Sequence, residues 1–139
     1  MTLLLDTNVL LDVLADRAPW AEHSAQVLGH VERGGATGYV AAHGVTTLYY
    51  LLATHRDRTT ARQKTRLLLR LLEVAAVDED RLLQALDLPM SDYEDAVQVA
   101  CAEKVGADVI VTRNPDDFGG TDLAVRSPTE LLARLGDAP

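Results

Sequence analysis

The residues best suited to chemistry in this chain are acidic, and they occur in three separate places. Asp6 follows a short apolar run near the N-terminus, Asp92 and Asp95 lie in the stretch Ser-Asp-Tyr-Glu-Asp, and Asp117 ends the stretch Asn-Pro-Asp-Asp. Carboxylate oxygens are ligands that Mg²⁺ and Mn²⁺ prefer. Carboxylates packed closely repel one another and raise one another's pKa unless a cation lies among them. If the fold brings the three places together, they predict a site for a divalent metal ion.

Asp6 lies where a predicted strand gives way to a predicted helix. Residues 3–5 are an unbroken apolar run, typical of a buried strand, and apolar residues resume at helical spacing over residues 9–14. In open α/β sheets, ligands bind beyond the carboxyl ends of the strands, so a carboxylate here faces a potential site. The alternative is that Asp6 or Asn8 only caps the helix that follows. This segment by itself favours neither interpretation.

Asp92 and Asp95 fall in the first turn of another predicted helix. The stretch Ser-Asp-Tyr-Glu has the capping-box pattern, which predicts a helix over residues 91–105 in which Glu94 reaches back to Ser91. Asp95 is then the first candidate site residue of this helix and Asp92 the second. The alternative is that these acids only complement the positive end of the helix dipole.

The third place follows a predicted strand over residues 108–112. If the sheet is parallel, this strand and the first one end at the same edge, and a helix returning antiparallel to them begins there too. Asn114 and Asp117 are therefore expected close to Asp6 and Asp95. Asn-Pro-Asp-Asp is also a good turn sequence whose side chains bond the local backbone, so by itself this stretch is a weak signal.

The order of the predicted elements favours one class of fold. Strands are predicted over residues 3–5, 37–41, 74–77 and 108–112. Helices are predicted over residues 9–14, 19–32, 45–54, 59–73, 79–86 and 91–105, and a second capping box starts one more at Ser127. This alternation predicts an α/β fold with a central parallel sheet between helices, in one domain spanning residues 1–139.

Composition narrows the function classes. Of the 139 residues, 47% are apolar, enough for a core of ordinary size. No apolar stretch approaches the roughly 18 to 20 residues that cross a bilayer, and no basic region of a signal peptide precedes Asp6. We therefore expect a soluble, cytoplasmic protein without a membrane partner. Cys101 is the only cysteine, which excludes an internal disulfide and a multi-cysteine zinc site, and we expect it in the core.

The charge balance is acidic but uneven. A net charge of −8 is unfavourable for passive binding to a phosphate backbone, although cations held by carboxylates can bridge to phosphate. Arg58, Arg62, Arg66 and Arg70 recur every four residues and so share one helical face. That face is either a solvated surface, a surface for a protein partner, or a contact for RNA.

Other catalytic classes lack their signatures. The four histidines have no ligand spacing, and we expect them outside the acidic site. There is no glycine-rich phosphate loop and no Ser-His-Asp or Cys-His arrangement. A phosphotransfer domain also places an aspartate after its first strand, but such sites usually need an Asp-x-Asp pair or a nearby lysine. Here Asn8 breaks the pair, and the only lysines are Lys64 and Lys104.

Three ordered motifs give the chain a family resemblance: Leu-Leu-Asp-Thr-Asn-Val-Leu-Leu, then Asp-Tyr-Glu-Asp-Ala, then Ile-Val-Thr-Arg-Asn-Pro-Asp-Asp-Phe. In order and spacing, over about residues 3–132, the chain resembles PIN-domain proteins, most closely bacterial toxins of the VapC kind. The resemblance implies a three-layer α/β/α fold and metal-dependent endoribonuclease activity on RNA. It also implies a cognate antitoxin protein as a partner and a possible homodimer.

The resemblance assigns roles to particular residues. The family's first acidic position falls on Asp6, its third on Asp95, and its fourth on the turn with Asn114 and Asp117. These residues, with Asp92, are implied to hold one or two Mg²⁺ or Mn²⁺ ions that activate a water molecule for phosphodiester hydrolysis.

The second acidic position is a departure from the family. Members usually carry glutamate in the helix after the second strand, and here Thr47 stands in its place, as in a branch that has lost this acid. Asp92 or Asp12 are the candidates to compensate in space. The alternative function is therefore a catalytically weakened PIN-like module that binds metal or RNA without turnover.

Overall fold

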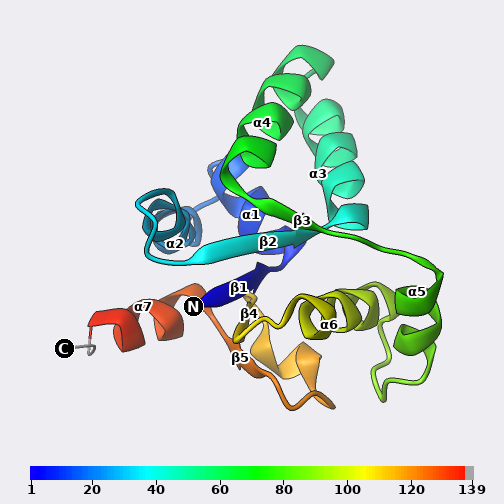
Figure 1. Cartoon of the computed structure of the whole chain (residues 1–139). Helices are drawn as coiled ribbons and strands as arrows, with labels where there is room; N and C mark the ends of the chain where they lie inside the picture. The colour runs from blue at the N-terminus through cyan, green and yellow to red at the C-terminus, as the bar shows by residue number, and fades with distance from the viewer. Residues whose placement is uncertain (137–139) are drawn as a thin grey trace.

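The computed structural model describes residues 1–136 and arranges five strands in one sheet between two layers of helices (Figure 1). The strand order is β3-β2-β1-β4-β5, and every neighbouring pair is parallel. The strands are β1 (Thr2–Leu5), β2 (Thr37–Ala41), β3 (Glu73–Ala75), β4 (Val109–Val111) and β5 (Ala124–Arg126). The predicted α/β fold with a central parallel sheet is confirmed.

The helices divide between the two faces of the sheet. One layer contains α1 (Thr7–Leu14), α2 (Ala21–Glu32), α3 (Ala42–His55), α4 (Arg58–Leu71) and α7 (Pro128–Gly136). The other contains α5 (Glu79–Leu86), α6 (Tyr93–Val105) and the short 3-10 helix η1 (Pro115–Phe118). Figure 1 shows α3 and α4 standing above β2 and β3, with α6 on the opposite side of the sheet.

Both faces of the central strands are buried, which explains their unbroken apolar sequence. In β1, Leu3 and Leu5 pack into the core beneath α1 and α2, while Leu4 packs into the core beneath α6. In β4, Ile110 joins Leu4 on that second face. A strand covered on both sides has no polar face, so it reads as a continuous apolar run. This burial fixes the ends of β1 and β4 next to each other.

Several predicted boundaries differ from those of the structure. Helix α1 begins at Thr7, directly after Asp6, and α3 begins at Ala42, earlier than its apolar pattern indicates. Strand β5 is absent from the prediction because its three residues are half-buried at the sheet edge and show no strong pattern. The glycine after α6, Gly106, has the left-handed conformation (φ 70°) expected of a residue that closes a helix.

The apolar segments of the chain and Cys101 bear on two further expectations. No helix in the described part of the chain is both long and apolar enough to span a membrane. Cys101 is fully buried, as expected of a core residue, and burial raises the pKa of its thiol to about 11.

Candidate functional site

Asp6 lies at the carboxyl end of β1 and links the first strand to its helix. Its backbone N–H donates to the carbonyl of Val111 in β4 (2.9 Å), and its own carbonyl accepts from Val9 at the start of α1 (3.0 Å). Although Asp6 stands at the N-cap position, its side chain makes no capping hydrogen bond. The carboxylate is therefore not used as a cap and is free for another role.

The Asp6 carboxylate is buried, with 4% of the residue exposed, and two neutral side chains hold it. Gln98 of α6 donates from Nε2 to Asp6 Oδ1 (2.9 Å), and Thr112 donates from Oγ1 to Asp6 Oδ2 (2.8 Å). No lysine or arginine pairs with Asp6 within residues 1–136. Its orientation is thus fixed while its negative charge stays uncompensated.

The first turn of α6 corrects the predicted capping box. The N-cap is Asp92, not Ser91, and Asp92 Oδ1 accepts the N–H of Asp95 (3.0 Å). Aspartate caps helices as well as serine does, so the helix starts later than predicted and Glu94 has no capping partner in Ser91. Asp92 therefore has the capping role that the prediction gave to Ser91.

Asp95 is the most strongly perturbed carboxyl group of the site. Its pKa is raised to about 7, first by burial and then, in decreasing order, by the negative charges of Asp92, Asp6, Asp117 and Glu94. Gln98 also reaches Asp95, with Nε2 3.5 Å from Oδ1. The three acidic places of the sequence thus meet around Asp95, as the parallel topology predicts.

The turn after β4 joins this group through Thr112. The Asn114 N–H donates to Thr112 Oγ1 (3.2 Å), and Asp117 N–H donates to the Asn114 carbonyl (3.1 Å) in η1. A cavity of about 440 Å³ opens between the turn and α6. It is lined by Pro89, Met90, Ser91, Asp92, Asp95, Asp116, Asp117 and Gly119. Asn114 is not among these lining residues, whereas Asp116 is.

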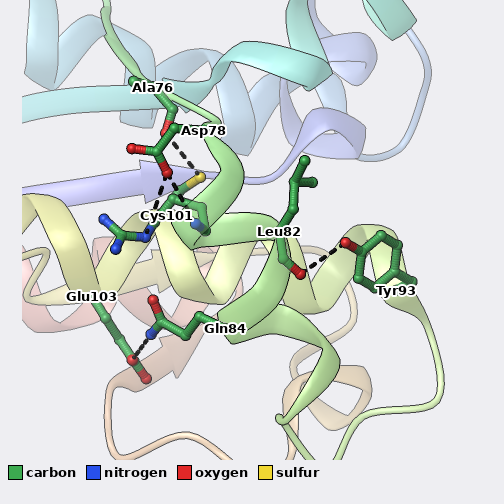
Figure 2. A network of polar contacts seen from close by, with 8 residues as sticks. Ala76, Asp78, Leu82, Gln84, Tyr93, Cys101 and Glu103 are labelled. Atoms are coloured by element: carbon green, nitrogen blue, oxygen red, sulfur yellow. Dashed lines mark hydrogen bonds and ion pairs between the residues drawn. The ribbon is translucent and has the colours of Figure 1, made fainter.

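Contacts between α5 and α6 hold helix α6, whose first turn contains Asp95, in place (Figure 2). Tyr93 in the first turn of α6 donates from its hydroxyl to the Leu82 carbonyl (2.9 Å), and Gln84 donates to Glu103 (2.8 Å). At the start of α5, Asp78 caps the helix by accepting the Arg81 N–H (2.9 Å). The beginning of α6 is therefore anchored from outside the acidic cavity.

The helix after β2 contributes no carboxylate to the site. Thr47 is partly buried in α3, and its hydroxyl donates to the His43 carbonyl of its own helix (3.2 Å). Helix α3 packs closely on α1, since a Cβ added at Gly44 would lie 2.7 Å from Thr7 Oγ1. His43, at this same edge of the sheet, has both ring nitrogens buried without a partner in the described chain. No spacing pattern had pointed to His43, Gln98 or Thr112.

Asp12, the other candidate to replace the missing acid, is already neutralised. It is fully buried in α1, and its Oδ1 lies 2.9 Å from Arg17 Nη2 and 3.5 Å from Arg113 Nη1. A carboxylate paired with two guanidinium groups is not available to a metal ion. The suggestion that Asp12 compensates for Thr47 is therefore wrong.

The arginines of α4 share one exposed surface, as their spacing predicts. Arg58, Arg62, Arg66 and Arg70 are all exposed, and none forms an ion pair within residues 1–136. Arg62, Arg66 and Arg70 line a groove of about 330 Å³ together with Tyr49. This face is a concentration of positive charge on an otherwise acidic chain.

The donor chemistry of the acidic cavity suits a hard cation, with one restriction. Within the described residues, no three His, Cys, Asp or Glu side chains are arranged to hold one metal ion. Mg²⁺ is often bound by one or two carboxylates, with water and substrate phosphate completing its shell. The carboxylates around Asp95 therefore fit an open magnesium or manganese site and not a closed protein cage.

Comparison with known proteins identifies the class to which this fold and acidic cavity belong. The PIN-domain family model matches residues 2–116, so the chain belongs to the PIN-domain family. None of the curated proteins compared with the chain matches it in sequence.

Solved structures of toxins and toxin-antitoxin complexes share the fold. A VapBC2 structure from Rickettsia felis, bound to a promoter DNA fragment, matches with a TM-score of 0.74 at 15% identity, covering 91% of this chain and 98% of that one. FitAcB from Neisseria gonorrhoeae matches with a TM-score of 0.69 at 22% identity, covering 91% and 98%. VapC20 from Mycobacterium tuberculosis, a Sarcin-Ricin loop cleaving toxin, matches with a TM-score of 0.64 at 15% identity, covering 78% and 86%.

Proposed function

We propose that this protein is a metal-dependent endoribonuclease that hydrolyses RNA phosphodiester bonds, and that it is the toxin of a toxin-antitoxin pair. One observation carries the proposal: the negative charges of Asp92, Asp6 and Asp117 all act on Asp95, and no described basic side chain forms an ion pair with any of these four carboxylates. Membership of the PIN-domain family and the fold shared with VapC20 support it.

In this proposal Asp6, Asp95 and Asp117, with Asp92, would hold one or two Mg²⁺ or Mn²⁺ ions, with water and substrate phosphate completing each shell because no three of these side chains are arranged around one ion. A bound divalent ion supplies a water molecule of lowered pKa and offsets charge on the phosphate. Asn114 orients the turn that carries Asp117, through its carbonyl contact with the Asp117 N–H.

The protein's own side chains keep the carboxylates in position. Gln98 and Thr112 hold the two oxygens of Asp6, and Gln98 also reaches Asp95, so one amide couples the two aspartates. Asp92 orders the backbone of Asp95 by accepting its N–H. Groups that fix a ligand in this way contribute to metal affinity without touching the ion.

Partners follow from the same class of protein. Several matched structures are toxin-antitoxin complexes, which supports a cognate antitoxin for this chain. A single domain over residues 1–139, a cytoplasmic location and a homodimer are part of the same proposal. The exposed arginines of α4 offer the positive surface that an RNA phosphate backbone needs on a chain of net charge −8.

A second candidate function is a PIN-like module that binds metal or RNA without cleaving it. Thr47 favours this alternative because the helix after β2 then adds no charge to the site, as in a branch of the family without the second acid. This alternative predicts affinity for Mn²⁺ or RNA with no turnover.

The test is RNA cleavage by purified protein with Mg²⁺, with Mn²⁺ and with a chelator, on single-stranded and structured RNA. Asp6→Asn and Asp95→Asn should each lower the cleavage rate by more than about 100-fold, since even residues that only support a metal ligand cost 10 to 100-fold. Asp80→Asn, which removes an exposed carboxylate of α5, is the matched control and should cleave normally. Cleavage that survives chelation or either site substitution would contradict the proposal.

A further inference from the structure

A second cavity lies at the same edge of the sheet as the acidic cavity, but on the opposite face. Its volume is about 300 Å³. It is lined by Pro19, Trp20, His23, Ser24, Arg113, Ser127, Pro128 and Thr129. These residues belong to the segment just before α2 and its first turn, to the loop after β4, and to the junction of β5 with the start of α7. We call this cavity the Trp20 pocket.

The chain connects the two cavities directly. Thr112 binds Asp6 of the acidic site through its hydroxyl, and the next residue, Arg113, lines the Trp20 pocket. Asn114, one residue further, begins the turn that carries Asp117. The residues that follow β4 therefore line both cavities, Arg113 the Trp20 pocket and Asp116 and Asp117 the acidic cavity.

The aromatic wall of the pocket is held in place before any ligand arrives. The Arg113 guanidinium carbon lies 3.9 Å from the centroid of the Trp20 ring, and Arg113 is anchored by the fully buried Asp12 at 3.5 Å. Trp20 itself is 42% exposed, so ring surface remains open to a ligand. A fixed aromatic ring lowers the cost of ordering the site on binding.

One of the residues that line the pocket, Ser24, has a polar group that lacks a partner in the described chain. Ser24 is 1% exposed, and its Oγ makes no hydrogen bond within the described chain. A buried hydroxyl without a partner costs stability, so its presence on a cavity wall points to a ligand that supplies the missing bond. The unpartnered Ser24 hydroxyl indicates a ligand site independently of the Trp20 ring and of the nearby start of α7.

We propose that the Trp20 pocket binds one nucleobase of a single-stranded RNA whose backbone passes the acidic cavity. The inference rests on the proposed function, because it names a subsite of the same substrate. The pocket's volume is at the lower end for ligand sites, which suits a single flat base. Stacking on an aromatic ring accepts any base, and Ser24 offers a hydrogen bond to the base edge. Arg113 adds positive charge beside the bound nucleotide.

Trp20 is the only tryptophan of the chain, so its fluorescence reports on this pocket alone. Wild-type protein in chelator, which prevents metal-dependent cleavage, is titrated with a single-stranded hexaribonucleotide. We expect a saturable change in Trp20 fluorescence that is lost when one particular nucleotide of the hexamer is made abasic. A full titration without any fluorescence change would overturn the proposal.

Variants separate stacking from folding, with affinity measured by anisotropy of a labelled hexamer. Trp20→Ala should weaken binding about tenfold and Trp20→Phe much less, because a phenyl ring still stacks. Ser24→Ala should weaken binding about fivefold without lowering the thermal midpoint, since the hydroxyl has no partner to lose. Tyr50→Ala, which removes a 67% exposed ring of α3, is the control and should bind as wild type.

The outcomes distinguish this inference from the proposed function. If wild type and Trp20→Ala bind and cleave RNA equally, the inference about the Trp20 pocket is wrong and the proposed nuclease function is retained. If RNA changes the Trp20 fluorescence in chelator but no cleavage occurs with Mn²⁺, base binding in the Trp20 pocket is supported and the proposed nuclease function is wrong. A fluorescence response to a protein partner, with none to RNA, would assign the pocket to that partner and overturn the inference.

Discussion

Helix α1 has a buried aspartate at each end, and the two carboxylates are treated in opposite ways. Asp12 is paired with Arg17 and Arg113, so its charge is compensated within the protein. Asp6 receives hydrogen bonds only from the neutral Gln98 and Thr112, and its charge acts on Asp95. Burial alone therefore does not identify a functional carboxylate. The difference is the missing counter-charge at Asp6, which in the proposed function is supplied by a bound divalent cation.

The largest effect expected on stability is at Asp12. Asp12→Asn should lower the free energy of unfolding by about 3 kcal/mol, because it leaves Arg113 and Arg17 without their buried counter-charge. Urea denaturation measures this loss. Asp6→Asn is the matched substitution at the other end of α1 and should change stability by no more than about 1 kcal/mol, since it removes a repelling charge along with hydrogen bonds. Equal losses at both positions would contradict the contrast between them.

Metal binding should separate the same two residues in the opposite direction. Mn²⁺ at 100 times its dissociation constant should stabilise wild type by about 2.7 kcal/mol. We expect this gain, measured as a shift in thermal midpoint without RNA, to persist in Asp12→Asn and to disappear in Asp6→Asn. A metal-induced shift that survives in Asp6→Asn would place the cation elsewhere.

The fold and the meeting of the acidic places could be predicted because both depend on strong local patterns. The apolar runs of β1 and β4 place Asp6 and Asn114 after neighbouring parallel strands, whatever the details of the helices. The contacts that hold Asp6 could not be predicted. Gln98 and Thr112 lie 92 and 106 residues from Asp6, and nothing in their local sequence distinguishes them from other polar residues.

The sequence also could not predict that, among the described residues, Asp12 has charged partners and Asp6 has none, because those partners are not recognisable in the local sequence. Asp6 follows the apolar residues of β1 and Asp12 follows those of α1. Only Asp12 has charged partners in the described chain, and these are Arg17 after α1 and Arg113 after β4. The predicted cap of α6 was wrong by one residue, because Ser91 and Asp92 are both good caps and the local sequence does not choose between them.

A substitution of Gln98 tests whether its neutral amide positions Asp6 and Asp95 for metal binding. Gln98→Met retains volume but removes the amide that binds both Asp6 and Asp95, so Mn²⁺ affinity should fall by about tenfold or more. Isothermal titration of Mn²⁺ measures it. Gln84→Met, which removes an amide bonded to Glu103 outside the cavity, is the control and should leave the affinity unchanged. Unchanged affinity in Gln98→Met would show that the amide does not position the ligands.

Asp92 gives the smallest and most discriminating effect, since it is both an N-cap and a wall of the acidic cavity. Asp92→Ala should cost about 1 kcal/mol of stability through the lost cap, as should Asp78→Ala at the cap of α5, which is distant from the cavity. Asp92→Ser keeps a capping oxygen and should restore most of that stability. Because serine carries no charge, Asp92→Ser should still bind Mn²⁺ more weakly than wild type, whereas Asp78→Ser should not. If Asp92→Ser regains both stability and metal affinity, Asp92 acts only as a cap, and the cation is left to Asp6, Asp95 and Asp117.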